Sequence, residues 1–357
     1  MEREGYYFGA GPAALPESIL REAQSVLLDW DNSGVSILEI GHRSARFVAL
    51  LQQAEADLRE LLAIPQNYHV LFLGGAARTQ FSMIPMNLLS VAKTQAAYMI
   101  SGVWSSFAFD EAKRFGAAYV MKPGEVCKPD TAYVYYTPNE TIDGVRFSAI
   151  PDTGDVPLVA DMTSCLLSEV IDVSRFGLIF AGAQKNIGPA GLTLVIIRDD
   201  LLHIKSNHIV PTMLDYRVHA KHHSLYATPP VFQCYMAAHM FQWVKAQGGL
   251  NALYAINREK AAKLYAYIDA SSYYQSMVDD VNARSLMNVC FSLSDQKHEP
   301  AFLAAAEACG LRGLKGHRLK GGIRASLYNA MPVDGVDALI QFMDNFAHGV
   351  STCKVNV

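Results

Sequence analysis

Two hydrophobic patterns alternate along most of the chain. Between residues 47 and 64, apolar side chains recur every three or four positions, which predicts an amphipathic helix that ends before Pro65. Short and almost continuously apolar runs lie between segments of helix length, as is typical of strands buried on both faces. We expect these strands at residues 69–73, 96–100, 132–136, 158–161, 178–181 and 192–197. The pattern predicts a parallel or mixed sheet flanked by helices.

The pattern changes in the last third of the chain. Long helical runs lie at residues 231–247 and 250–268, and shorter runs follow at 288–293 (strand), 300–309 and 335–348 (helices). Strands and helices in this arrangement are typical of a separate α+β unit. We therefore expect a large α/β domain at residues 15–258 and a small domain formed by residues 1–14 and 259–357.

The composition is that of a protein with a large core. Apolar residues make up 51% of the 357 positions and charged residues 18%, against about 25% in an average domain. Such low charge favours a chain that buries part of its surface in an oligomer. The 34 acidic and 30 basic residues give a net charge of −4 with no basic block. A nucleic-acid partner is disfavoured, because phosphate neutralisation needs concentrated lysine and arginine.

Cysteine usage and hydropathy indicate a reducing, water-exposed location. The cysteines form no CxxC pair, so neither a zinc site nor a disulfide framework is indicated, and we expect no bound metal. They are Cys127, Cys165, Cys234, Cys290, Cys309 and Cys353. No signal peptide is indicated at the N-terminus. The uncharged stretch 222–244 contains Pro229, Pro230 and Gln233, which argue against a membrane span. We expect a cytoplasmic protein with no membrane partner.

Candidate chemistry lies just after the predicted strands, since ligands of open α/β sheets bind beyond the carboxyl ends of the strands. Residues 74–79 form a small-residue turn whose N–H groups can hold a phosphate, although the motif alone favours an ordinary tight turn. Trp104 follows the next strand and is either a core residue or a platform for a ring.

Asp161 and Lys185 end two further strands. A carboxylate at the end of a buried strand needs compensation, and Asp161 either caps a turn or meets a cationic group. Lys185 follows an apolar strand into the small-residue turn 182–191, where burial would lower its pKa and make the amine a nucleophile; an exposed lysine is the simpler alternative. Together, a lysine for an imine, an aspartate for a pyridinium nitrogen, a stacking aromatic and a phosphate turn match the needs of pyridoxal phosphate.

At this point the sequence resembles a known family, the phosphoserine aminotransferases within the class V aminotransferases, which are pyridoxal-phosphate enzymes of fold type I. The resemblance runs from the segment FGAGPAALP at residues 8–16 to YNAMP at 328–332. Its most specific segments are YTPNETIDG at 136–144, AGAQKNIGPAG at 181–191, KGHR at 315–318 and GGIRAS at 321–326. It implies the fold-type-I architecture, with a mixed, mostly parallel sheet in the large domain and a smaller α+β domain.

The resemblance also implies a role for each matching residue around the cofactor ring. Lys185 would form the imine with pyridoxal phosphate and later act as general base and acid. Asp161 would hold the pyridine nitrogen, Trp104 would stack on the ring, and Thr141 would bind the phenolic oxygen.

The cofactor phosphate would be held from two subunits. Ala77, Arg78 and Gln184 would bind it within one chain, and Thr228 would reach it from the other subunit of a homodimer. Ala227 stands where the family usually has asparagine, and Ala10 replaces a usual serine. These departures put cofactor affinity and KM in doubt, not the reaction class.

The implied substrates each carry two anionic groups: glutamate and 2-oxoglutarate, O-phosphoserine and 3-phosphohydroxypyruvate. Arg324 would bind the α-carboxylate. His317 and Arg318, with His42 and Arg43 of the second subunit, would bind the phosphate or the side-chain carboxylate. Bidentate arginine suits both groups. Without the resemblance, each His-Arg pair is explained as solvated surface.

Other activities remain open at the level of sequence. The same scaffold supports cysteine desulfuration, for which Cys309 is the candidate, although its place late in a helical run favours a core residue. A broader aminotransferase that also takes 4-phosphohydroxy-threonine in vitamin B6 synthesis is compatible with the resemblance. A cofactor-binding protein without turnover is disfavoured by the presence of Lys185, Asp161 and Arg324.

Overall fold

The computed structural model describes residues 4–349, so Cys353 and the last residues of the expected small domain lie outside it. A seven-stranded sheet forms its centre, in the order β2-β10-β9-β8-β5-β3-β4. The strands are β2 (Tyr68–Gly74), β3 (Gln95–Met99), β4 (Ala117–Val120), β5 (Thr131–Tyr136), β8 (Leu158–Asp161), β9 (Leu178–Gly182) and β10 (Leu192–Arg198). β10 runs antiparallel to both neighbours and the other adjacent pairs are parallel. The expected mixed sheet is present.

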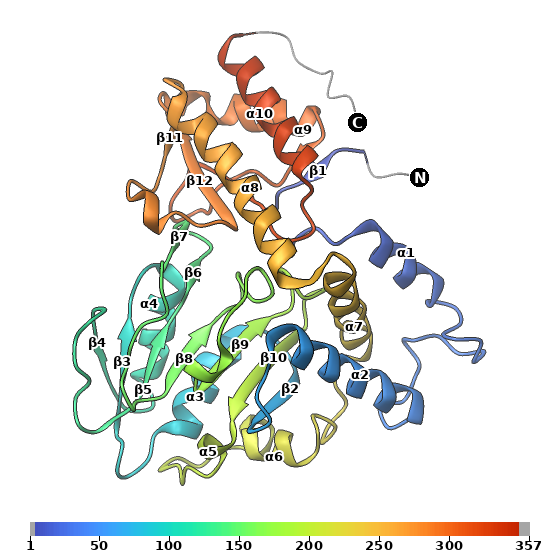
Figure 1. Ribbon diagram of the computed structural model, residues 1–357, viewed down its shortest axis with the longest axis vertical. Coiled ribbons are helices and arrows are strands. Elements are labelled where there is room, and N and C mark those ends of the chain that lie inside the picture. Colours follow the sequence, from blue (N-terminus) through green and yellow to red (C-terminus); the bar gives the residue numbers. More distant parts are fainter. Residues whose placement is uncertain (1–3, 350–357) are drawn as a thin grey trace.

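Apolar clusters cover both faces of this sheet, as the continuous apolar runs predicted. In β2, Val70 and Phe72 belong to one cluster and Leu71 and Leu73 to the other, because successive side chains of a strand point to opposite faces. The first cluster includes α2 (Ala45–Leu62) and α7 (Val231–Ala246), and the second includes α3 (Gln80–Leu88), α4 (Val103–Ala112) and α6 (Tyr216–Lys221). Figure 1 shows these helices around the sheet.

Helix α2 illustrates how local sequence sets its bounds. The Ser44 hydroxyl accepts a hydrogen bond from Phe47 N, which satisfies one of the free N–H groups of the first turn. At the other end Ala63 adopts the left-handed conformation (φ 49°) and stops the helix two residues before Pro65. The remaining short elements of this part are α1 (Glu17–Ser25), η1 (Ala77–Thr79), β6 (Asn139–Glu140), β7 (Val145–Arg146), η2 (Val173–Arg175), α5 (Asp199–Leu202) and η3 (Thr212–Leu214).

The C-terminal part forms a smaller core of its own. A three-stranded antiparallel sheet, β11-β12-β14, packs with helices that follow the large sheet in sequence. Its elements are α8 (Gly249–Ala270), β11 (Tyr274–Ser276), η4 (Val281–Ala283), β12 (Asn288–Leu293), η5 (Gln296–His298), α9 (Glu299–Ala308), β13 (Leu311–Arg312), β14 (Ile323–Ser326) and α10 (Val333–Ala347). The N-terminal strand β1 (Tyr6–Tyr7) pairs with β13, and Phe8 joins this core. Since α8 crosses residues 258 and 259 unbroken, the domain boundary stays a prediction.

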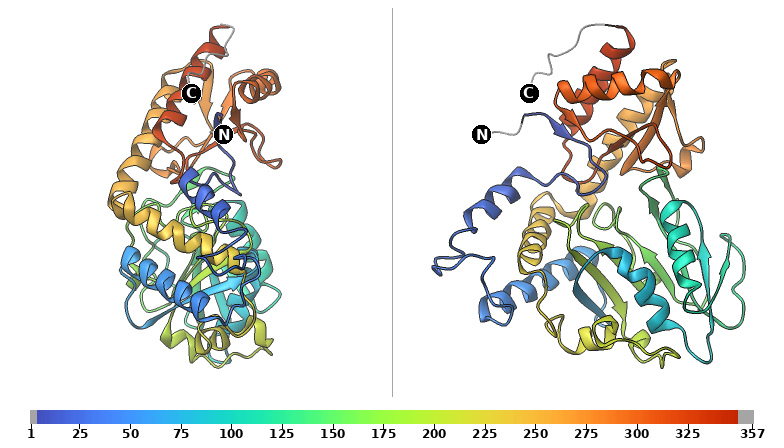
Figure 2. Two further views of the ribbon diagram at one scale, coloured as in Figure 1. Left: turned by 90° about the vertical axis from the view of Figure 1, so that its right-hand side faces the viewer. Right: turned by 180° about the vertical axis from the view of Figure 1, so that it is seen from behind.

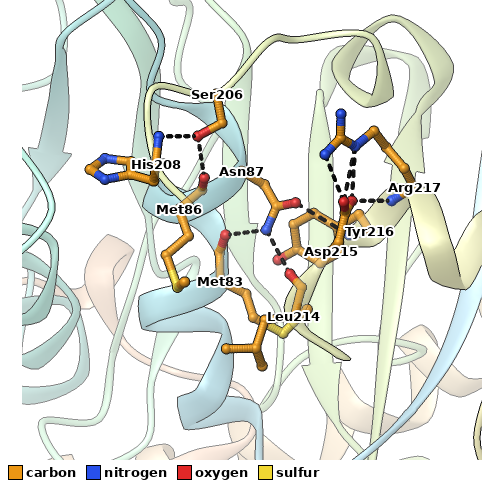
Figure 3. A network of polar contacts seen from close by, with 9 residues as sticks. All are labelled: Met83, Met86, Asn87, Ser206, His208, Leu214, Asp215, Tyr216 and Arg217. Carbon is orange, nitrogen blue, oxygen red and sulfur yellow. Dashed lines mark hydrogen bonds and ion pairs between the residues drawn. The ribbon is translucent and has the colours of Figure 1, made fainter. Parts of the chain in front are cut away.

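The segment between β10 and α7 is fixed by polar contacts. Asn87 donates to the carbonyl of Leu214 (2.8 Å) and accepts from Tyr216 N (3.2 Å), while the Ser206 hydroxyl donates to the carbonyl of Met86 (2.6 Å) (Figure 3). These contacts attach the segment that precedes Thr228 to the last residues of α3. In the described part of the chain no helix is long and apolar enough to cross a membrane.

Candidate active site

A cavity of about 430 Å³ opens where the parallel strands end, and it gathers most of the sequence-predicted residues. These are Ala77, Arg78, Trp104, Thr141, Asp161, Gln184, Lys185, His317 and Arg324. They come from the segments after β2, β3, β5 and β9, from the last residue of β8 and from the C-terminal part. Ligands of open α/β sheets bind beyond the carboxyl ends of the strands, and these predicted residues lie at that edge of the sheet.

Lys185 lies in the turn after β9 with only 8% of its surface exposed. Its Nζ donates a hydrogen bond to the Thr141 hydroxyl. Burial lowers the pKa of Lys185 to about 8, while the negative charge of Asp161 opposes the shift and the Arg324 guanidinium adds to it. The alternative of an exposed lysine is excluded, and a neutral amine is accessible near neutral pH.

Asp161 is the last residue of β8 and is also buried. Its Oδ1 accepts a hydrogen bond from Thr163 N (3.0 Å) and so caps the turn, as one of the two alternatives predicted. Its Oδ2 lies 3.5 Å from the hydroxyl of Tyr135. Burial raises the pKa of Asp161, and the hydrogen bonds of Thr163 and the charge of Lys185 lower it. A cationic ring nitrogen in the cavity would stabilise this carboxylate further.

Trp104 lies in the first turn of α4, and its position is set by a residue that sequence reasoning did not single out. The buried carboxylate of Glu140 accepts from Trp104 N (3.0 Å), Ser105 N (2.8 Å) and the Ser105 hydroxyl (2.7 Å). It therefore binds the free N–H groups of the helix terminus. The partly buried Trp104 lines the cavity, and its Nε1 is buried without a partner among the described residues. Trp104 also packs against the second apolar cluster, so its role as a platform for a ring stays a prediction.

The turn after β2 offers backbone N–H groups to the cavity. Ala77 begins η1, which continues into α3, and the first N–H groups of such a helix have no partner within it. Ala76 is extended (φ −83°, ψ 146°), a conformation that does not require glycine. Gly182 lets Gln184 fold back, since a Cβ there would lie 2.6 Å from Gln184 Oε1.

Two cationic residues reach the cavity from the C-terminal part. Arg324 lies in β14, where its Nη1 donates to the carbonyl of Thr141 (3.3 Å). His317 lies in the loop before β14, and burial, followed by the charges of Arg324 and Arg318, lowers its pKa. Arg318 is exposed and does not line the cavity.

Three sequence-predicted residues lie away from this cavity within one chain. His42 and the exposed Arg43 precede α2, and the exposed Thr228 lines a second cavity of about 230 Å³ beside β2 and α3. The resemblance placed all three in a partner subunit's site, so their roles stay predictions. Cys309, the candidate for desulfuration, packs against the core of the C-terminal part and does not line the active-site cavity.

The residues present fit pyridoxal phosphate. The cavity provides a nucleophilic amine, a buried carboxylate, an aromatic face with an unpartnered N–H, and helix-terminal N–H groups for a phosphate. No group of three or more His, Cys, Asp and Glu side chains within residues 4–349 is placed to hold a metal ion.

The fold and this cavity define a member of the class V aminotransferases: the model of that family matches residues 5–339, and the chain belongs to it. The chain is 58% identical over 360 residues to phosphoserine aminotransferase of Legionella pneumophila strain Corby, covering 97% of this chain and 99% of the relative. It superposes with TM-score 0.94 on phosphoserine aminotransferase of Bacillus circulans subsp. alkalophilus, at 44% identity over 98% of this chain and 99% of that one.

A further solved structure, the PLP-bound phosphoserine aminotransferase of Trichomonas vaginalis, superposes with TM-score 0.90 at 39% identity, over 96% of this chain and all of that one. The family resemblance and the fold-type-I architecture predicted from the sequence are confirmed by these comparisons.

Proposed function

We propose that this chain is a pyridoxal-phosphate-dependent aminotransferase that exchanges the amino group between glutamate and 3-phosphohydroxypyruvate, giving O-phosphoserine and 2-oxoglutarate in serine biosynthesis. One observation carries the proposal: a single cavity joins the Lys185 amine and the Asp161 carboxylate with the Arg324 guanidinium and His317. The identities of 58% and 44% to the phosphoserine aminotransferases of Legionella pneumophila and Bacillus circulans support the substrate pair.

Each residue around the ring has a distinct task. Lys185 would hold the cofactor covalently, Asp161 would face its ring nitrogen, and Trp104 and Thr141 would orient the ring. When bound, pyridoxal phosphate supplies an electron sink that stabilises the negative charge left when the α-proton of an amino acid is removed. Ala77, Arg78 and Gln184 would hold its phosphate through the turn after β2.

Lys185 is also the residue suited to move the α-proton. A general base works best when its pKa is near the working pH, and burial brings the pKa of Lys185 to about 8. Its Nζ takes the proton as a neutral amine and returns it as an ammonium. Thr141 accepts a hydrogen bond from Nζ and so orients the amine toward the cavity.

Two cationic groups match the two anionic groups of the substrates. Arg324 would bind the α-carboxylate, and His317 with Arg318 would bind the phosphate or the side-chain carboxylate. Because both substrates present anions at both ends, the same site accepts them in turn. Adding 4-phosphohydroxy-threonine to the absorbance titration described below decides whether it is a further substrate.

The shared site of a homodimer forms part of the proposal. Helix α1 and the loop after it project from the body (Figures 1 and 2) and expose Leu27, Leu28 and Leu38, with Leu28 89% exposed. Apolar side chains on a projecting loop favour contact with another protein surface. His42 and Arg43 follow this loop and, with Thr228, would complete the partner's cavity. We place the enzyme in the cytoplasm.

The experiment is an absorbance titration of the cofactor-loaded protein. Glutamate and O-phosphoserine should each abolish the visible band of the bound cofactor, alanine should not, and Lys185→Ala should not respond. A band that responds only to other amino acids would overturn the substrate assignment. The subunit arrangement is tested by mixing Lys185→Ala with Arg43→Ala: recovery of activity in mixed dimers requires the two residues to serve one site from different chains.

A further inference from the structure

The loop that carries His317 and Arg318 has a defined shape. We call residues 316–322 the substrate loop. It is closed at its base by the bridge between Lys315 and Ile323 and by a hydrogen bond from Gly316 N to the Gly322 carbonyl (2.9 Å). The backbone then turns on Gly321 and Gly322, both left-handed (φ 72° and 68°). Inside the loop, Gly321 N donates to the His317 carbonyl (2.8 Å).

One ion pair ties this loop to the opposite wall of the cavity. Lys320 Nζ lies 2.8 Å from Asp143 Oδ1, and Asp143 Oδ2 accepts a hydrogen bond from Val103 N (2.9 Å). Val103 is the first residue of α4 and precedes Trp104. The carboxylate of Asp143 therefore joins the substrate loop, from the C-terminal part, to the helix turn that carries the ring platform.

We propose that Asp143 and Lys320 are positioning residues for substrate binding, acting as a latch that fixes the substrate loop over the cavity; this inference rests on the reaction proposed above. The latch sets where His317 and Arg318 lie relative to Arg324, and hence the spacing of the two anion sites. Neither side chain lines the cavity, so they act through the loop and not by touching the substrate.

The latch also masks a charge that would oppose the substrate. The negative charge of Asp143 is felt at His317, where it raises the pKa against the larger lowering effects of burial, Arg324 and Arg318. Lys320 neutralises that charge. Without Lys320, the carboxylate would repel a phosphate or carboxylate bound at His317. Loss of the latch is therefore expected to weaken anion binding by two routes, through loop position and through repulsion.

The size of the effect follows from exposure. The Lys320 side chain is 46% exposed and that of Asp143 only 12%, so water screens the pair from one side. Ion pairs of this kind change an equilibrium about two- to five-fold. Lys320→Met should therefore raise KM for O-phosphoserine about two- to five-fold, with kcat and the visible band of the cofactor unchanged. Lys320→Arg should restore KM.

Lys263→Met is the matched control. Lys263 forms an ion pair with Asp337 between α8 and α10, within the C-terminal part. The Lys263 side chain is 38% exposed, close to the 46% of Lys320, whereas Asp337 is 47% exposed and Asp143 only 12%. This variant loses the same charge and a similar pair but leaves the substrate loop untouched, so its KM should equal that of the wild type.

A double-mutant cycle isolates the latch. Asp143→Asn retains an oxygen for Val103 N but loses the ion pair. The double variant Asp143→Asn with Lys320→Met should therefore differ from the wild type in log KM by less than the sum of the two single-variant differences. Equal KM in Lys320→Met and Lys263→Met, with a wild type that turns over O-phosphoserine, would overturn the latch alone. A wild type that does not turn over O-phosphoserine would overturn the proposed function instead. Additive effects in the cycle would also refute the latch.

Discussion

Among residues 4–349, two lysines are buried and have lowered pKa values, yet only one of them should be reactive. Lys185 lines the active-site cavity and its pKa is about 8. Lys260 is fully buried in α8, where burial lowers its pKa to about 7. Its Nζ donates to the carbonyls of Leu327 (3.0 Å), Tyr328 (2.9 Å) and Met331 (2.9 Å). Burial lowers the pKa of both lysines, but the N–H groups of Lys260 are held by three carbonyls, whereas the cavity of Lys185 admits a reagent.

The pKa of Lys185 sets the magnitude of the expected effect. A lysine with pKa about 8 is roughly 20% neutral at pH 7.4, against about 0.1% for an ordinary lysine near 10.4. Because only the neutral amine is a nucleophile, Lys185 in the cofactor-free protein should react roughly 200-fold faster than an unshifted lysine of equal access. Asp161→Asn removes the charge that supports the ammonium, so it should lower the pKa of Lys185 further.

Competitive acylation of the cofactor-free protein measures this directly. The protein is treated with a trace of acetic anhydride between pH 6 and 11, and each lysine is quantified by mass spectrometry. Lys185 should show a midpoint near pH 8, Lys260 should stay unlabelled until the protein unfolds, and the exposed Lys221 provides the surface reference. Added pyridoxal phosphate should protect Lys185 alone. A surface-like midpoint for Lys185, or equal labelling of Lys185 and Lys260, would refute the reasoning.

Three further variants test the site and its frame. Lys260→Met leaves three buried carbonyls without their donor and should lower the free energy of unfolding by about 3 kcal/mol or more in urea at pH 7. The pKa of Lys260 is lower in the folded than in the unfolded chain, so the unfolded chain binds more protons between about pH 7 and 10.5. The free energy of unfolding of the wild type should therefore contain a contribution from Lys260 that rises with pH across that range, and Lys260→Met should lack it. Asp161→Asn should reduce kcat about 100-fold or more at saturating cofactor, because the ring nitrogen loses its anionic partner while Thr163 N keeps an acceptor; an unchanged kcat would remove Asp161 from the reaction. Glu140→Gln should lower stability by about 0.3–2 kcal/mol and speed cofactor loss, measured by thermal unfolding and by dialysis, because the terminus of α4 loses its anion.

The strands and the reactive pair could be predicted because each leaves a local signal. A strand buried on both faces needs a continuous apolar run, and the predicted run at residues 158–161 coincides with β8, which ends on Asp161. Other elements leave weaker signals. β4 at the sheet edge has two exposed and two half-buried residues and no buried one, and we did not predict it. Nearly every residue of α3 is buried, and Pro85 lies inside it, so no helical period stands out.

The supporting carboxylates could not be predicted because their partners are distant in sequence. Glu140 and Asp143 lie within the family segment 136–144, but their task is to bind the N–H groups of Trp104, Ser105 and Val103, more than thirty residues earlier. Every residue except proline has a backbone N–H, so the sequence does not show which N–H a given carboxylate will bind. The packing of β6 beside α4 brings these carboxylates and the N–H groups of α4 together.

Buried amides hold Lys185 in place relative to Arg324, and their residue type alone does not show which groups they bind. Asn186, next to Lys185, accepts from Asn329 N (3.0 Å); Asn329 in turn donates to the Leu167 carbonyl (2.8 Å) and accepts from Asn257 of α8 (2.9 Å). Buried amides are costly unless paired, so these bonds require the large sheet and the C-terminal part to keep one relative position. Because Asn329 follows β14, which carries Arg324, the same amides fix the guanidinium relative to the Lys185 amine. The distance between the Lys185 amine and the Arg324 guanidinium is therefore set by amides that lie far apart in the sequence, and the sequence does not show how they pair.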